Sequence, residues 1–391
     1  MRYLTENFSK LTATLAGLLL ITSGVAAAAP TMPVPAPPQI GATSYILLDH
    51  ASGEVLASQN VDQPIEPASI TKLMTSYIVF SELRSGGLNL QEMVPVSEKA
   101  WRTEGSKMFI EVGNQVQVSD LLKGMIVQSG NDASVALAEH IAGSEETFAA
   151  LMNQYAASLG MNNSNFLNAT GLPAAEHLTT ARDIATLSSA LIRDFPDYYK
   201  WYSEKEFTFN EIRQHNRNNL LWRDPAVDGL KTGHTSSAGY CLAASAQRGG
   251  MRLISVVMGS ASENSRADDS QKLLNYGFRF FETHQLYRAG EELSRVKVWK
   301  GVDEELGLGI AGDIHITIPS GQYENLRAET EVMSVLTAPL ASGYEVGSLR
   351  VFLGDELKAS SPLLTLNEVE RGGFWRRMSD SIALWFHDFG D

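Results

Sequence analysis

Apolar residues recur along the first 285 residues in two patterns, one typical of strands and one typical of helices. Short apolar runs at residues 44–49 and 54–58 enclose the turn-forming sequence His50-Ala51-Ser52-Gly53, which predicts a β-hairpin. Runs at residues 239–246 and 251–258 predict a second hairpin. Helical spacing predicts helices at residues 69–83, 118–127, 132–142, 145–159, 179–193 and 265–283. Strands at both ends with helices between them predict an α/β sandwich whose sheet is mostly antiparallel.

The pattern changes after residue 285 to short alternating runs separated by Gly, Pro and Asp turns. Such runs are typical of a domain built only from strands. The clearest strands are predicted at residues 295–299, 314–318, 328–336 and 349–352. We therefore place the α/β domain at residues 41–285 and a small β-sandwich domain at residues 286–366.

The last segment, residues 367–391, has the pattern of an amphipathic helix. At about 100° per residue, seven apolar side chains fall within roughly a 120° arc: Phe374, Trp375, Met378, Ile382, Trp385, Phe386 and Phe389. The opposite side carries Arg376, Arg377, Asp380, His387 and Asp388. A terminal aromatic stripe predicts a helix on a membrane surface, with Gly372-Gly373 as a hinge that detaches it. The alternative is a helix docked on the β domain.

The first 40 residues read as targeting and linker sequence. Arg2 and Lys10 precede a largely apolar run at residues 11–25, and the small residues Ala26 to Ala29 follow it. This is the order of parts in a secretory signal peptide, and the apolar run is short for a membrane span. We predict a signal peptide over residues 1–29, a proline-rich linker over residues 30–40, and a protein that is exported.

Composition narrows the class of function. The chain has 391 residues, 44% of them hydrophobic, and a formal net charge of −14, which argues against nucleic acid as a partner. Its one cysteine, Cys241, lies in an apolar run and is expected to be a small buried side chain. His177, His215 and His234 do not have the spacing of metal ligands, so we predict neither a metal nor a cofactor.

Three short motifs, well separated and in a fixed order, carry the candidate chemistry. They are Ser69-Ile70-Thr71-Lys72, Ser129-Gly130-Asn131 and Lys231-Thr232-Gly233. On a helix, residues i and i+3 share a face, so Lys72 can bring its amine to the Ser69 hydroxyl. A serine needs such a base to become a nucleophile, and a lysine can act as the base only while it is neutral. The first motif therefore predicts a serine nucleophile with a lysine base.

The other two motifs supply the remaining parts of an acyl-transfer site. Ser129 can pass a proton between the lysines and a leaving amine, and Asn131 has an amide that can hold a substrate peptide group. Lys231 adds a positive charge, which is expected to lower the pKa of Lys72 and to attract a carboxylate. Gly233 allows a strand edge to approach the substrate, and the backbone N–H groups of Ser69 and His234 are candidate oxyanion donors.

With these motifs the chain resembles the low-molecular-mass penicillin-binding proteins, the serine-type S11-like D-alanyl-D-alanine carboxypeptidases. The resemblance rests on the three motifs, the Lys231-Thr232-Gly233-His234-Thr235 continuation, the β domain and the terminal helix. It implies a serine β-lactamase/DD-peptidase-like fold, and an acyl-enzyme on Ser69 that releases D-alanine from peptidoglycan stem peptides. It also implies acylation by β-lactam antibiotics, and a peripheral place at the periplasmic face of the cytoplasmic membrane. Arg266 stands where the family has an arginine near the substrate carboxylate, with Thr232 as its partner.

Three alternatives stay open at this point. A D,D-endopeptidase that cleaves crosslinks would use the same residues. A β-lactamase would need a fast deacylating base, and the Glu-x-x-Leu-Asn pattern of class A enzymes is missing between Asn131 and Lys231. A non-catalytic cell-wall scaffold with a degenerate site is the third, although the motif residues are intact.

Overall fold

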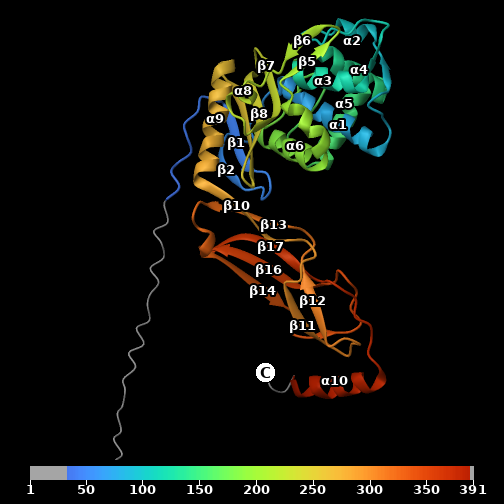
Figure 1. Ribbon diagram of the computed structural model, residues 1–391, viewed down its shortest axis with the longest axis vertical. Coiled ribbons are helices and arrows are strands. Elements are labelled where there is room, and N and C mark those ends of the chain that lie inside the picture. The colour runs from blue at the N-terminus through green and yellow to red at the C-terminus, as the bar shows by residue number, and fades with distance from the viewer. Residues whose placement is uncertain (1–32, 388–391) are drawn as a thin grey trace, which may run out of the picture. The chain divides into compact units, whose positions relative to one another are not determined.

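The computed structural model describes residues 33–387 (Figure 1). The predicted signal peptide, the start of the linker and Phe389 lie outside the described residues, so these predictions stay untested by the structure.

The α/β domain is built on one five-stranded antiparallel sheet. Its strands, in the spatial order β2-β1-β9-β8-β7, come from both ends of the domain. They are β1 (Ser44–Asp49), β2 (Val55–Gln59), β7 (Val227–Thr235), β8 (Gly239–Arg248) and β9 (Met251–Ser260). The first strand pairs with the last, Leu47 opposite Ser255. Both predicted hairpins and the mostly antiparallel sheet are confirmed.

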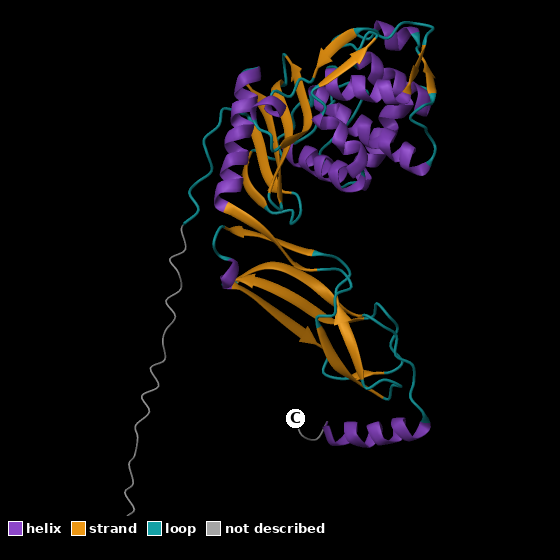
Figure 2. Ribbon diagram, viewed as in Figure 1, coloured by secondary structure: helices purple, strands orange, loops and turns teal. Residues whose placement is uncertain are grey.

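Helices cover both faces of the sheet (Figure 2). Successive side chains of a strand point to opposite faces, so one strand can pack against helices on both sides. Leu47 packs in a core with Leu273 and Leu274 of α9, whereas Ile46 packs in the larger core of the helical layer. The helices are α1 (Lys72–Ser85), α2 (Glu98–Arg102), α3 (Val118–Lys123), α4 (Asn131–Ala142), α5 (Glu145–Ser158), α6 (Ala181–Asp194), α7 (Pro196–Tyr199), α8 (Leu220–Arg223) and α9 (Glu263–Phe280). A 3-10 turn, Ala68–Thr71, precedes α1, and a π-helical turn, Gly124–Gln128, follows α3.

Helix α1 runs through the middle of the helical layer. Its first nine residues, Lys72 to Phe80, are all buried, including the polar ones. A helix covered on every side shows no amphipathic stripe, so packing and not propensity holds it in place. The nucleophile motif is therefore anchored to a helix whose first half is enclosed on every side.

Several boundaries differ from the sequence-based predictions. Helix α9 ends at Phe280, because the next residues form strand β10 (Phe281–Tyr287), so the domain boundary predicted at residue 285 falls inside a strand. Helix α6 is capped by Thr180, whose side chain accepts from Asp183 N, one residue later than predicted. Two short antiparallel strand pairs were not predicted, since strands of three or four residues carry little periodicity: β3 (Met93–Pro95) with β4 (Gln115–Gln117), and β5 (Glu206–Phe209) with β6 (Ile212–His215).

The second domain is a small β-sandwich, as predicted. A six-stranded sheet in the order β14-β16-β17-β12-β11-β15 faces the pair β10-β13. Its strands after β10 are β11 (Ser294–Trp299), β12 (Glu305–Gly309), β13 (Ile314–Pro319), β14 (Leu326–Val332), β15 (Leu336–Thr337), β16 (Glu345–Leu353) and β17 (Glu356–Thr365). Ile316 and Ile318 of β13 pack against Leu349 and Leu363 of the larger sheet. The run predicted at residues 328–336 is divided between β14 and β15.

The terminal helix α10 (Phe374–His387) is docked through its polar side. Buried Asp380 accepts a hydrogen bond from Lys300 N at 2.6 Å, and Arg376 pairs with Glu304. The described apolar stripe is exposed: Phe374, Trp375, Met378, Ile382, Trp385 and Phe386. The helix is therefore docked on the β domain, as in the alternative given above, but its apolar side faces away from the protein. Among the described residues, none of the helices is long and apolar enough to cross a membrane.

The glycine pair before α10 is not the free hinge that we predicted. Gly372 is buried, its N–H donates to Lys300 O at 2.8 Å, and an added Cβ would lie 2.7 Å from Gly301 O. Gly372 instead permits a close approach of two backbone segments, since glycine has no Cβ to keep them apart.

Candidate active site

The nucleophile motif occupies a tight turn, which brings Ser69 and Lys72 together. Side chains three residues apart are eclipsed in a 3-10 turn, and Ser69 belongs to the turn that leads directly into Lys72 and α1. Lys72 Nζ lies 3.0 Å from Ser69 Oγ. This is hydrogen-bond distance for a nucleophile and its base.

Lys72 is enclosed, with 1% of its surface exposed, and its amine has two further partners. Nζ donates to Asn131 Oδ1 at 2.7 Å and to the Thr170 carbonyl oxygen at 2.6 Å. Burial lowers the pKa of Lys72 to about 7, and the nearby Asp132 carboxylate acts in the opposite direction. The sequence left burial and a nearby positive charge such as that of Lys231 as possible causes of a lowered pKa, and burial is the larger effect on Lys72.

The second motif follows the π-helical turn after α3. Ser129 has φ +67° and reverses the chain, so the break in the helix is at Ser129 and not at Gly130, where we expected it. Ser129 Oγ is buried and has no hydrogen-bond partner among the described residues. An unpaired buried hydroxyl is costly, and it is explained where the group serves a reaction. Ser129 lines the same cleft as Ser69.

Asn131 begins α4 and is buried, and both ends of its amide are used within the protein. Its Oδ1 accepts from Lys72, and its Nδ2 donates to the Glu104 carbonyl oxygen at 2.6 Å. Asn131 does not line the cleft. In this structure Asn131 holds the Lys72 amine, and a contact of its amide with a substrate peptide group stays a prediction.

The third motif lies within β7, the edge strand of the sheet. Lys231 is buried, and its pKa is well below its usual value because of that burial and of the positive charges of Lys72, Arg266 and Arg217. An added Cβ on Gly233 would lie 2.9 Å from Pro67 O and 3.1 Å from Ala68 Cβ. Gly233 thus lets the strand approach the catalytic turn, and it also lines the cleft, where its approach to a substrate stays a prediction.

Arg266 lies in the first turn of α9 and is buried over the cleft. Its guanidinium donates to the Gly233 carbonyl oxygen at 3.3 Å and to Glu263 at 3.0 Å, and it stacks over the Tyr240 ring. His234, which is exposed, stacks on the same Tyr240 ring, with 4.0 Å between the two ring centroids. Arg266 is therefore held in place, and is not a solvated arginine at a helix start.

These residues surround one cleft with a volume of about 230 Å³. Its lining is Ser69, Ser106, Ser129, Arg217, Thr232, Gly233, His234, Tyr240, Glu263 and Arg266. Lys72, Asn131 and Lys231 lie behind this lining. The sequence-based prediction missed Arg217, which is exposed and adds positive charge; a single arginine after a short strand carries no motif or spacing signal.

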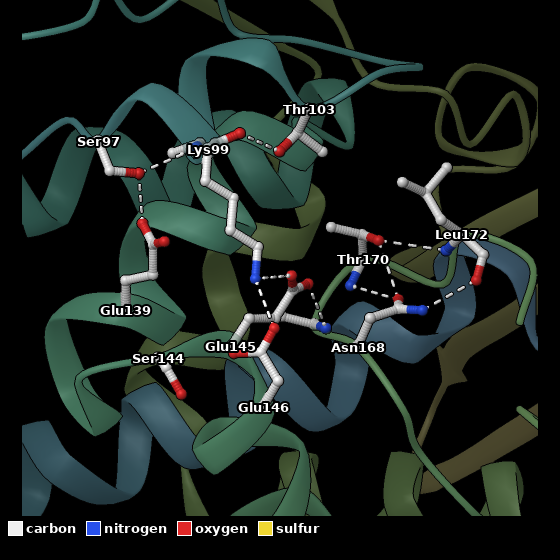
Figure 3. A network of polar contacts seen from close by, with 12 residues as sticks. Ser97, Lys99, Thr103, Glu139, Ser144, Glu145, Glu146, Asn168, Thr170 and Leu172 are labelled. Carbon is white, nitrogen blue, oxygen red and sulfur yellow. Dashed lines mark hydrogen bonds and ion pairs between the residues drawn. The ribbon is translucent and has the colours of Figure 1, made fainter.

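A turn between α5 and α6 supplies the backbone oxygen that contacts the Lys72 amine. Figure 3 shows Asn168 of this turn with Thr170 and Leu172. The Asn168 side chain accepts from Thr170 N at 3.1 Å and from Gly171 N at 2.7 Å, and donates to Leu172 O at 2.9 Å. This network fixes the Thr170 carbonyl oxygen that contacts the Lys72 amine. Sequence reasoning had no means of finding a backbone oxygen.

The geometry defines a serine acyl-transfer site with a lysine base, and comparison with known proteins gives its family. Residues 31–262 match the peptidase S11 family, described as D-alanyl-D-alanine carboxypeptidase, and residues 281–371 match the C-terminal domain of penicillin-binding protein 5. The D-alanyl-D-alanine carboxypeptidase DacC of Escherichia coli is 46% identical over 360 residues, 90% of each chain.

Comparison with solved structures also gives penicillin-binding proteins. Penicillin-binding protein 5 of Haemophilus influenzae is 46% identical with a TM-score of 0.82, over 86% of this chain and 99% of that one. Penicillin-binding protein D2 of Listeria monocytogenes, solved with ampicillin bound, is 31% identical with a TM-score of 0.57, over 62% of this chain and 100% of that one. The chain belongs to the D-alanyl-D-alanine carboxypeptidase family, peptidase S11.

Proposed function

We propose that this enzyme removes the terminal D-alanine from peptidoglycan pentapeptide through an acyl-enzyme on Ser69. The observation that carries the proposal is the 3.0 Å separation of Ser69 Oγ from the buried amine of Lys72. A lysine with a pKa of about 7 is substantially neutral near pH 7, so it can take the serine proton. Ser69 then attacks the D-Ala-D-Ala carbonyl carbon, and D-alanine leaves as the amine.

Proton transfer to the leaving amine is assigned to Ser129. Its hydroxyl is buried, unpaired within the described residues and on the cleft wall, so it is available to a substrate atom. A proton taken by Lys72 from Ser69 would pass through Ser129 to the leaving nitrogen. Lys231, a second buried amine behind the cleft lining, compensates the charge that develops during this proton transfer. Deacylation returns Ser69 when water attacks the acyl carbonyl.

The substrate carboxylate is assigned to the other side of the cleft. Thr232 and Arg266 line it together, and Arg266 is fixed there by Gly233 O and Glu263. A positioned guanidinium is well suited to a carboxylate. The backbone N–H groups of Ser69 and His234 are proposed as the oxyanion donors. A terminal carboxylate is what distinguishes a carboxypeptidase substrate from an internal peptide bond.

One assay tests this assignment against its neighbours. We expect D-alanine release from a soluble pentapeptide to be faster than cleavage of a crosslinked peptide dimer, and β-lactam hydrolysis to be slow once the acyl-enzyme has formed. Faster cleavage of the dimer would favour the endopeptidase. Rapid turnover of penicillin would favour the β-lactamase. If no substrate gave any product, the non-catalytic scaffold would be the remaining alternative.

Lys231→Ala is expected to lower the rate of acylation by penicillin about tenfold to a thousandfold, with a smaller change in thermal stability. The substitution removes a buried amine behind the assigned carboxylate site, where positioned hydrogen-bond donors contribute strongly. Stopped-flow acylation and thermal melting measure the two effects. A melting temperature that falls far while the rate per folded molecule stays the same would show that Lys231 is a structural residue.

Export and a peripheral place at the periplasmic face of the cytoplasmic membrane are the localisation that we propose. The C-terminal helix supports it: Asp380 and Arg376 hold α10 by its polar side, which leaves a stripe of aromatic and aliphatic side chains exposed. Such a stripe buries favourably at the boundary of headgroups and acyl chains. Its polar side carries both signs of charge, so apolar burial contributes more than attraction to anionic lipid.

Removal of residues 373–391 is expected to release the enzyme from membranes and to leave peptidase activity on soluble peptides unchanged. Trp375→Glu tests the same point without deletion, since it places a charge in the exposed stripe. Ala383→Glu is the matched control, because Ala383 is exposed outside the stripe. Vesicle sedimentation measures binding. Equal binding by Trp375→Glu and the unaltered protein would refute the anchor.

A further inference from the structure

His177 is a fully enclosed histidine next to the active site that the mechanism above does not use. It lies between α5 and α6, with 1% of its surface exposed. Leu167 N donates to its Nδ1 at 3.2 Å, so Nδ1 carries no proton. Nε2 must therefore carry the ring proton, and it lies 2.9 Å from Thr71 Oγ1, to which it donates. The two contacts select one tautomer.

The contact with Thr71 joins two parts of the active site. Thr71 stands between Ser69 and Lys72 in the catalytic turn and is wholly buried. On the other side of His177 is the segment that carries the Asn168 turn and the Thr170 carbonyl oxygen on Lys72. The segment also presses on the turn directly, since a Cβ on Gly171 would lie 1.7 Å from Ala68 O.

From this geometry we propose that His177 is a positioning residue, which locks the segment at residues 167–172 onto the catalytic turn and so holds Thr170 O against the Lys72 amine. The proposal rests on the proposed function, since it takes Lys72 as the base. A carbonyl oxygen 2.6 Å from Nζ fixes the direction of the amine. Without this contact, the Thr170 carbonyl oxygen could move and the Lys72 amine would no longer be held in one direction. A displacement of the amine by about an ångström from the Ser69 hydroxyl is expected to lower the rate strongly.

The surroundings keep the ring in the neutral form that this role requires. Burial lowers the pKa of His177 to about 4, and the Glu66 carboxylate acts weakly in the opposite direction. The ring edge faces Phe166, an apolar neighbour, with 5.9 Å between centroids. Lys72, one residue from Thr71, is the nearest cation on the catalytic helix. Protonation of Nδ1 would remove the acceptor of Leu167 N, and the enclosed site disfavours it.

Three variants separate the two contacts. His177→Asn keeps an acceptor near the place of Nδ1 and loses the donor to Thr71; His177→Gln does the reverse; Thr71→Val removes the acceptor while keeping the shape of the side chain. We expect penicillin acylation at saturation to fall about tenfold in His177→Asn and in Thr71→Val, and less in His177→Gln. Penicillin affinity before acylation should change little, because none of these side chains lines the cleft.

The double variant His177→Asn with Thr71→Val decides the matter. If the pair acts through one hydrogen bond, the double variant is no slower than either single one. Additive losses would overturn the proposal, as would variants that melt earlier yet acylate at the unaltered rate per folded molecule. A failure of the proposed function is seen separately, since the unaltered protein would then form no adduct at all.

Discussion

Replacing Ser69 with alanine is expected to abolish both the covalent adduct with penicillin and the release of D-alanine, with a loss of about 10⁴-fold or more in rate. The reason is that the acyl-enzyme is an ester of Ser69 Oγ, which lies 3.0 Å from the buried Lys72 amine, and within residues 33–387 no other hydroxyl makes a hydrogen bond to that amine. Intact-mass measurement after incubation with penicillin detects the adduct as one added mass.

Ser85→Ala provides the matched control. Ser85 ends the same helix that Lys72 begins and is exposed, and its hydroxyl donates to Glu82 O and accepts from Gly87 N, both beside the end of that helix. This variant should label fully. An adduct that persists in Ser69→Ala would place the nucleophile elsewhere, with Ser129 as the first residue to examine, since it is a buried serine of the same cleft.

The fold could be predicted to the extent that its elements are long. Strands β8 and β9, ten residues each, and helices α4 to α6 were located from apolar spacing. Short strands such as β3 and β5 were not, because three or four residues cannot show a period. The end of α9 was misplaced because Phe280 and Phe281 suit a helix and a strand equally, and pairing of Phe281 with Pro319 on β13 decides between them.

The site could be predicted for side chains that belong to a motif and not for the groups that hold them. Ser69, Ser129 and Thr232 were placed together by the motifs, Arg266 was implied by the family resemblance, and all four line one cleft in the structure. The Thr170 carbonyl oxygen has no side-chain signature, so a contact of 2.6 Å to Lys72 was invisible.

Two motif residues have contacts within the protein that the motifs do not reveal. Gly233 and Asn131 were predicted to face a substrate, which stays a prediction, and in the structure they contact the catalytic turn and the Lys72 amine. A motif names residues that are close together, and only coordinates show which protein groups each of them contacts. Gly372 follows the same rule: a close backbone contact and a hinge are identical in sequence.

The rate of acylation by penicillin is expected to rise with pH through a value of about 7, because only neutral Lys72 can accept the Ser69 proton. Burial lowers the pKa of Lys72 to about 7, so the neutral fraction is small well below that pH and nearly complete well above it. An ordinary lysine, with a pKa of about 10.4, would give a rate that still climbs in strongly alkaline solution. Stopped-flow acylation measured from about pH 5 to pH 9 covers both cases.

Lys72→Arg should lower the rate about 10² to 10⁴-fold at every pH and remove the rise near pH 7. A guanidinium stays protonated throughout this range, so it can occupy the amine's place without acting as a base. Lys231 is also a buried amine with a lowered pKa, and the Lys231→Ala variant shows which lysine the rise belongs to. If the rise persists in Lys231→Ala and vanishes in Lys72→Arg, Lys72 is the base. If it persists in Lys72→Arg, the base is another group, and the enclosed amine beside Ser69 only orients the nucleophile.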